Sequence, residues 1–140
     1  MTGNYSWRAW VAIAVVAHLV VVLFHGQAHA RLGVGLSDWQ QAYVLAVIVI
    51  APVVALALSF TRYGTAGLWL LLASMLGSLI FGGIYHYLIV SPDHVAHLPP
   101  GDARGAFRFT ALLLLVTEVI GVIVAAMMLR TPFKTGLRGQ

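Results

Sequence analysis

The sequence predicts an all-α integral membrane protein, an antiparallel four-helix transmembrane bundle with a short interfacial helix between the third and fourth spans. Of its 140 residues, 61% are hydrophobic and only 9% are charged, whereas a soluble domain averages about 25% charged residues. Four apolar runs of about 20 residues, the length that crosses a bilayer, use most of the chain. Short links make successive spans antiparallel. We therefore expect a single membrane domain over residues 1–140.

The first span is expected at about residues 8–30 and carries three histidines. His25 and His29 follow His18 by seven and eleven residues, which places both within roughly 20° of His18 around a helix. An imidazole stripe within a bilayer must face protein or water rather than lipid.

The same segment also has features of a secretory signal. Arg8, the apolar run after it and Ala28-His29-Ala30 resemble a signal peptide with a small-x-small cleavage site, which would remove residues 1–30. The histidine within the apolar run and the single arginine before it favour a retained span.

The second span is expected at about residues 39–60. Ser37 and Asp38 are a plausible helix start, and Trp39 and Tyr43 suit an interfacial aromatic belt. Pro52, near the middle, should kink the helix because it has no backbone N–H and its ring crowds the preceding turn.

The third span is expected at about residues 66–90, after a short turn. Ser74, Ser78 and Gly82 recur at every fourth position, and the next residue of that row is His86. Small residues at this spacing let a neighbouring helix or a flat cofactor approach the backbone closely. The row therefore leads its neighbour to an imidazole.

A short interfacial helix is expected after the third span. Ser91-Pro92-Asp93 combines an N-cap residue, a proline at the first helical position and an acid in the first turn. The run Pro99-Pro100-Gly101 must end that helix. It would present His94 and His97, at positions i and i+3, on one face.

The fourth span is expected at about residues 106–129, with Glu118 as its one ionisable residue near mid-bilayer. Ala111, Leu114, Gly121 and Ala125 share its face at three- and four-residue spacing, so that face should pack against protein. The ten residues from Thr131 onward are Gly-rich and basic and suggest a loose cytoplasmic tail.

The distribution of basic residues predicts the orientation. Five Lys or Arg residues fall on the side of the termini and three on the other side, which favours both termini in the cytoplasm of a multi-pass inner-membrane protein. In that topology five of the six histidines collect at the outer end, over a mid-membrane pair formed by His18 and Glu118.

This constellation favours a transition-metal site. His25 and His29, at i and i+4, can point at one ion, and His86 with His94 or His97 can complete the shell. Asp93 is a candidate ligand or hydrogen-bond partner of a ligand. The ion would be Fe, Cu or Zn, in a redox, metal-handling or oxidase-associated role. A b-type haem, held by His86 opposite His25 or His18, is the second version of this hypothesis.

Four other interpretations stay open. His18 and Glu118 can share a proton in a small transporter or proton-path subunit. The polar residues can instead serve a structural subunit of a larger membrane complex. The histidines can also be unligated interfacial residues, and a His18–Glu118 hydrogen bond can simply lock two helices together.

Composition and motifs exclude several other classes. The chain has no cysteine, so thiolate metal sites and disulfides are ruled out. No basic cluster is dense enough to follow a phosphate backbone, so we expect no nucleic-acid partner. The lipid bilayer is the expected partner, with other membrane subunits or further copies of the chain as additional ones. Neither a hydrolytic triad nor a phosphate loop is recognisable, so whether the protein is an enzyme stays open.

Overall fold

The computed structural model describes residues 3–130, and these residues form helices joined by short links, with no strands among them. The helices are α1 (Gly3–Leu32), α2 (Asp38–Tyr43), the π-helix η1 (Val44–Ile50), α3 (Ala51–Ser59), α4 (Gly64–Gly83), the π-helix η2 (Ile84–Leu88) and α5 (Arg104–Arg130). The expected tail from Thr131 to Gln140 lies outside the described residues.

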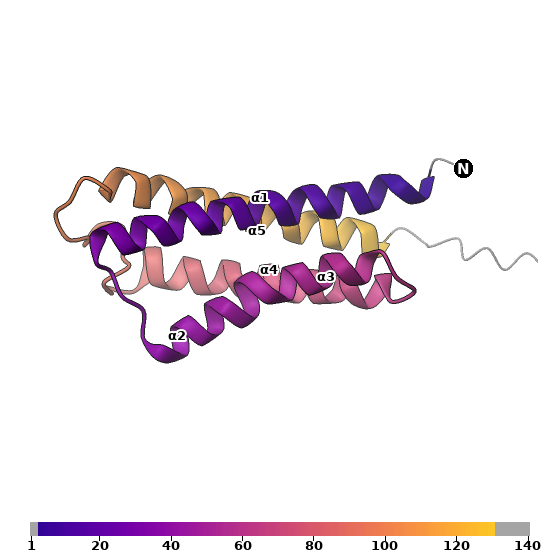
Figure 1. Cartoon of the computed structure of the whole chain (residues 1–140), viewed down its shortest axis with the longest axis horizontal. Coiled ribbons are helices and arrows are strands. Elements are labelled where there is room, and N and C mark those ends of the chain that lie inside the picture. The colour runs from indigo at the N-terminus through magenta and orange to yellow at the C-terminus, as the bar shows by residue number, and fades with distance from the viewer. Residues whose placement is uncertain (1–2, 131–140) are drawn as a thin grey trace, which may run out of the picture.

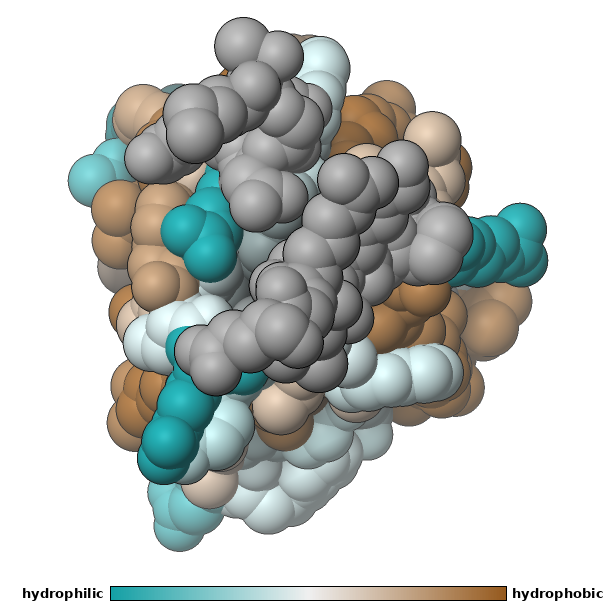
Figure 2. Space-filling model, turned by 90° about the vertical axis from the view of Figure 1, so that its right-hand side faces the viewer, coloured by the Kyte–Doolittle hydropathy of each residue, from teal (hydrophilic) through white to brown (hydrophobic). Residues whose placement is uncertain are grey.

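Four helical stretches are long and apolar enough to cross a membrane. Each begins and ends within two residues of an expected span; the stretches are Trp7–Leu32, Asp38–Ser59, Gly64–Leu88 and Arg104–Arg130. Their outward residues are largely apolar, as the large exposed side chains of Leu23, Phe24, Trp69, Ile80 and Phe109 show. Figure 2, which views the molecule from the end where α1 begins, shows hydrophobic residues along its sides. The predicted multi-pass membrane protein is supported to this extent.

The helices lie side by side along one long axis (Figure 1). α5 contacts both α1 and α4, and α3 contacts α4. α1 begins at the same end of the molecule as α5 finishes, so the turn after α1, the end of η2 and the start of α5 share the opposite end. We call this second end the histidine end, because His25, His29 and His86 lie there.

The second stretch is irregular where Pro52 was expected to disturb it. The π-helix η1 directly precedes the turn that contains Pro52. Since proline has no N–H, the carbonyl of Ile48, four residues earlier, loses its ordinary helical donor. In Figure 1, α3 follows α4 while α2 lies apart from the other helices. The predicted break therefore takes the form of a π-helical segment that redirects the chain.

The link between α1 and α2 is fixed by two helix-end motifs. Gly33 has φ +64°, and the N–H groups of Gly33 and Val34 donate to the carbonyls of Ala30 and His29, which together form a Schellman motif. Ser37 is the N-cap of α2, as expected, and its N–H donates to Gln40 Oε1 at 2.9 Å. Both ends of the link are therefore held by its own sequence.

The expected helix faces are buried as the spacing predicted. Ser74, Ser78 and Gly82 of α4 are buried. The small-residue face of α5 is buried as well, and includes Ala111, Leu114, Glu118, Gly121 and Ala125. One apolar core cluster lies at the end away from the histidines, which we call the apolar end, and consists of Val11, Val15, Ala55, Leu68, Leu71, Met75 and Ala125. A second, smaller cluster lies at the histidine end and consists of Ala28, Val34, Leu98, Phe107 and Ala111.

The expected interfacial helix is wrong in form. The segment from residue 91 to residue 98 makes turns and bends, not a helix. Ser91 Oγ donates to the Tyr85 carbonyl instead of capping a following turn. The Ala96 N–H donates to the His94 ring instead of a helical carbonyl, and two prolines follow at once. The backbone bonds that remain in the segment form isolated turns, from His94 to Ser91 and from His97 to His94, and the side-chain bonds compete with any continuation into a helix.

Candidate metal centre

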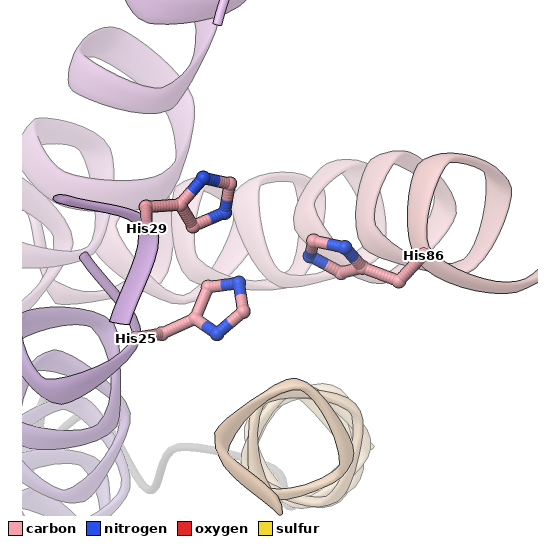
Figure 3. Close-up of side chains that lie close together, drawn as sticks. All are labelled: His25, His29 and His86. Atoms are coloured by element: carbon pink, nitrogen blue, oxygen red, sulfur yellow. The ribbon is translucent and has the colours of Figure 1, made fainter. Parts of the chain in front are cut away.

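Three histidines from two separate helices converge at the histidine end. His25 and His29 project from the last turns of α1, and His86 from η2 faces them (Figure 3). One ring nitrogen from each lies within 4.8 Å of the others. His25 and His86 are each 6% exposed, and His29 is half-buried. The predicted meeting of these imidazoles is therefore present.

The Nδ1 atom of each ring is held by an oxygen. His29 Nδ1 lies 3.1 Å from the Val34 carbonyl, and His86 Nδ1 lies 3.1 Å from the Asp93 carbonyl. A carbonyl only accepts, so both Nδ1 atoms carry the proton and donate.

His25 follows the same pattern with a hydroxyl as acceptor. Its Nδ1 lies 2.9 Å from Thr110 Oγ1. That hydroxyl donates to the Ala106 carbonyl at 2.7 Å, as is usual for a threonine within a helix. Its proton is therefore used, and it accepts from His25 Nδ1.

These three bonds select the same tautomer in each imidazole. With the proton on Nδ1, each Nε2 keeps a lone pair. His25 Nε2 is buried and has no hydrogen-bond partner within the described residues. Metal-binding histidines characteristically donate their second ring N–H to a carbonyl or similar acceptor, which fixes ring orientation and raises ligand basicity. All three histidines of the site have such an acceptor at Nδ1.

Local sequence explains how the acceptors reach the rings. The positive φ of Gly33 reverses the chain after α1 and returns the Val34 carbonyl to His29. Beyond η2, the Val95 N–H donates to the carbonyl of His86. This pairing keeps the loop with Asp93 folded over the ring that it holds.

Two α5 residues at the site were not predicted. Phe107 is fully buried, and its ring centroid lies 4.6 Å from that of His25 and 4.7 Å from that of His29. Thr110 supplies the hydroxyl described above. Phe107 lies four residues before Ala111, and Thr110 lies four residues before Leu114, so both belong to the inward face of α5. Extending that face one turn toward the start of the helix would have identified them.

A cavity of about 390 Å³ adjoins the triad. Its lining includes the three histidines and, farther into the structure, Glu118. Glu118 is 1% exposed, and its Oε2 has no hydrogen-bond partner within residues 3–130. Gly82 lies between them: a Cβ there would be 3.7 Å from His86 Cδ2 and 3.9 Å from Glu118 Oε2.

His18 makes no hydrogen bond to Glu118 within the described residues, so the interpretation that such a bond locks two helices together is wrong. The fully buried His18 ring donates from Nε2 to the Ile48 carbonyl at 3.2 Å, while its Nδ1 has no partner there. Pro52 explains this choice, because it leaves the Ile48 carbonyl in need of a donor. His18 therefore joins α1 to the second helical stretch.

The loop after η2 contributes differently from what the sequence predicted. The Asp93 carbonyl holds His86, while its buried side chain lines the cavity. Burial raises the pKa of the Asp93 carboxyl, and the nearby His29 partly opposes that rise.

His94 and His97 lie outside the triad, with ring centroids 4.8 Å apart. His94 donates to the Tyr87 carbonyl and accepts from the Ala96 N–H, so both ring nitrogens are used. A ligand role for His94 or His97 stays a prediction, and for His94 it requires these turns to rearrange.

Three imidazoles beside a cavity can hold a divalent ion and leave a coordination position for an exogenous ligand. The surrounding shell of acceptors is already in place. No protein-family model, curated protein or solved structure matches this chain, so its function is argued from the geometry of this site.

Proposed function

We propose that this protein binds a transition-metal ion through His25, His29 and His86, at the outer end of a four-helix transmembrane bundle. The observation that carries the proposal is that each ring donates from Nδ1 to an oxygen and so keeps the lone pair of Nε2. In Figure 3 the ring nitrogens that lie farther from the backbone are turned toward one another, and one ring nitrogen of each histidine lies within 4.8 Å of the others. Nothing within the described residues uses the lone pair of the buried His25 Nε2. A bound ion would use it.

The distances suit a site that closes around an ion. Ligand nitrogens in a tetrahedral zinc site lie about 3.3 Å apart, given Zn–N bonds of about 2.0 Å. The three candidate nitrogens lie within 4.8 Å of one another. Small side-chain rotations would draw them together, and the hydrogen-bonded Nδ1 atoms serve as pivots.

The arrangement favours a bare ion over haem. Axial imidazoles on opposite faces of a porphyrin have ring centroids roughly 6 Å apart, because each nitrogen is about 2.0 Å from the iron. The His25 and His86 centroids are 4.9 Å apart, and His29 lies close to both. His18, the other candidate axial ligand, already donates from Nε2 to Ile48. Fe, Cu or Zn as a simple ion is therefore the proposed cofactor.

The cavity next to the triad supports a functional metal site rather than a purely structural one. Structural metal sites are usually closed by four protein ligands, whereas catalytic sites keep one coordination position for substrate or water. Here the cavity adjoins the histidines. We place the protein in a redox, metal-handling or oxidase-associated role on this ground.

Metal binding by the stripped protein tests the proposal. The full chain in lipid nanodiscs, freed of metal by a chelator, should bind one Zn²⁺ or Co²⁺, and a His25→Ala/His86→Ala variant should lose that binding while keeping its helical circular dichroism. His97→Ala is the comparison variant: it should keep the binding, because His97 lies outside the triad, and loss of binding would instead assign His97 as a further ligand. Equal binding by the double variant would refute the proposal, and a Soret band in the purified protein would replace the bare ion with haem.

A second candidate function rests on Glu118. Its buried, unpartnered Oε2 is the kind of intramembrane acid that marks proton or ion paths. In that case Glu118→Gln should abolish proton-coupled flux in liposomes, while the His25→Ala/His86→Ala variant should keep it. Unchanged flux in Glu118→Gln, or no flux in the unmodified protein, would eliminate this candidate.

A further inference from the structure

The cavity beside the triad is larger than a metal site needs. Its volume is about 390 Å³, whereas a water molecule occupies about 30 Å³. Val22, Val44, Ile48, Phe81 and Leu114 form much of its wall. Apolar cavities tend to exclude water and to accept apolar molecules. An ion with one or two waters would leave most of this space unfilled.

The cavity wall carries Gln41, Ser78 and Asp93 and, in addition, two polar positions between which a ligand can lie. The histidine triad occupies one, and Glu118 Oε2 occupies the other. A Cβ at Gly82 would lie 3.7 Å from His86 Cδ2 and 3.9 Å from Glu118 Oε2, so these two atoms are no farther apart than the two distances combined. Cδ2 is bonded to Nε2, the nitrogen available to a metal. A single small ring can therefore reach from the carboxyl group to the ion.

The chemistry of Glu118 selects a hydroxyl as its partner. A hydroxyl both donates and accepts, so it pairs with the ionised and with the protonated carboxyl group. A carbonyl pairs only with the protonated form. An ammonium group would place a further positive charge near the metal ion, in a region of low dielectric constant.

We propose that the cavity binds a neutral, membrane-soluble aromatic diol, with one hydroxyl on Glu118 and the other oxygen at the metal. A ring holds two oxygens at a fixed separation and loses little conformational freedom on binding. Its apolar faces match Val22 on α1 and Val44 and Ile48 on η1, which wall the cavity from two sides. The proposal rests on the proposed metal site for its outer contact only.

A pair of matched probes tests the inner contact. Tetramethylhydroquinone and tetramethylbenzene share a ring and its methyl groups and differ in the two hydroxyls. Metal-free protein in nanodiscs, kept anaerobic so that the diol stays reduced, should bind the hydroquinone at least tenfold more tightly. The hydrogen bond to a buried, otherwise unpaired group is the source of that factor.

Two variants at Glu118 distinguish a hydrogen bond to Glu118 from simple partitioning of the probes into the lipid. Glu118→Leu should reduce hydroquinone affinity roughly tenfold and leave tetramethylbenzene affinity unchanged, whereas Glu118→Gln, which can still bond a hydroxyl, should retain it within about threefold. Equal affinity for the two probes, or hydroquinone binding insensitive to Glu118→Leu, would overturn the proposal. The probe comparison on the unmodified protein decides the matter even where Glu118→Leu does not fold.

Zinc loading tests the outer contact and keeps the two proposals distinguishable. Zn²⁺ should tighten hydroquinone binding and leave tetramethylbenzene binding unchanged. Zinc that binds without affecting the hydroquinone would refute the contact with the metal. A protein that binds no zinc, but binds the hydroquinone in a Glu118-dependent way, would refute the metal site and keep Glu118 as the recognition residue.

Discussion

The two ends of this protein use similar residues in opposite ways. At the apolar end, a Cβ on Gly67 would lie 2.7 Å from the Ala55 carbonyl, and one on Gly121 would lie 2.7 Å from Met75. At the histidine end, Gly26 and Gly35 line the cavity, and a Cβ on either would meet nothing within 4 Å. Gly67 and Gly121 therefore permit close packing, whereas Gly26 and Gly35 border open space.

Buried polar side chains also differ in how they are satisfied, although not strictly by end, since Arg8 Nε near the start of α1 has no hydrogen-bond partner within the described residues either. Ser59 and Ser74 donate to carbonyls of their own helices, Leu56 and Leu71, and so satisfy themselves locally. His25 Nε2 and Glu118 Oε2 have no partner among the described residues. Because an unpaired buried polar group costs about 1–3 kcal/mol, a protein that leaves such groups beside a cavity sacrifices stability there. Such a sacrifice is typical of binding sites.

The largest expected effect is at the apolar end. Gly67→Ala should destabilise the protein by about 3 kcal/mol, because the added Cβ meets backbone atoms that cannot move independently of their helix. The thermal unfolding midpoint in nanodiscs measures it. Gly26→Ala, whose Cβ has free space, is the control. Similar midpoints for the two variants would remove the contrast between the ends.

A smaller effect is expected from the hydroxyl behind His25. Thr110→Val removes the acceptor of His25 Nδ1, and loss of such an outer partner typically weakens metal binding about 10- to 100-fold. Zinc titration of the chelator-treated variant measures the loss. Thr110→Ser retains the hydroxyl and should bind zinc like the unmodified protein. Normal affinity in Thr110→Val would mean that His25 is not oriented through this bond.

Gly82→Ala should slightly stabilise the protein, in contrast to the destabilisation expected for Gly67→Ala. The new Cβ makes ordinary contacts at 3.7 and 3.9 Å, and alanine is a better helix former than glycine by about 1 kcal/mol. We expect a slightly higher unfolding midpoint and unchanged zinc affinity. A midpoint that falls as it does in Gly67→Ala would show that the histidine end is packed as closely as the apolar end.

The sequence predicted the helices and the triad for a simple physical reason. Apolar runs of membrane length determine where spans lie, and helical periodicity determines which residues share a face. His25 and His29 had to point the same way, and the row from Ser74 through Gly82 led to His86.

Helical periodicity could not predict the contacts between segments that are distant in the sequence. Nothing local pairs Thr110 with His25 across 85 positions of sequence, or directs His18 to the carbonyl that Pro52 frees. The loop with His94 and His97 has the sequence signals of a helix start, but Ser91 and the His94 ring form hydrogen bonds that compete with a helix. Those bonds could not be predicted from the cap signals. Side-chain competition for backbone groups decided those cases.

The smallest predicted effect concerns Asp93, at the boundary between loop and cavity. Burial raises the pKa of its carboxyl above the value in the unfolded chain. The folded state therefore binds the proton more tightly, and stability is lost as the pH rises from the unfolded pKa, about 4, through the folded pKa. Asp93→Asn should consequently raise the unfolding midpoint at neutral pH and have little effect near pH 4. The backbone carbonyl that holds His86 is unchanged by this substitution. A midpoint gain that is equal at both pH values would mean that the effect comes from packing and not from the buried charge.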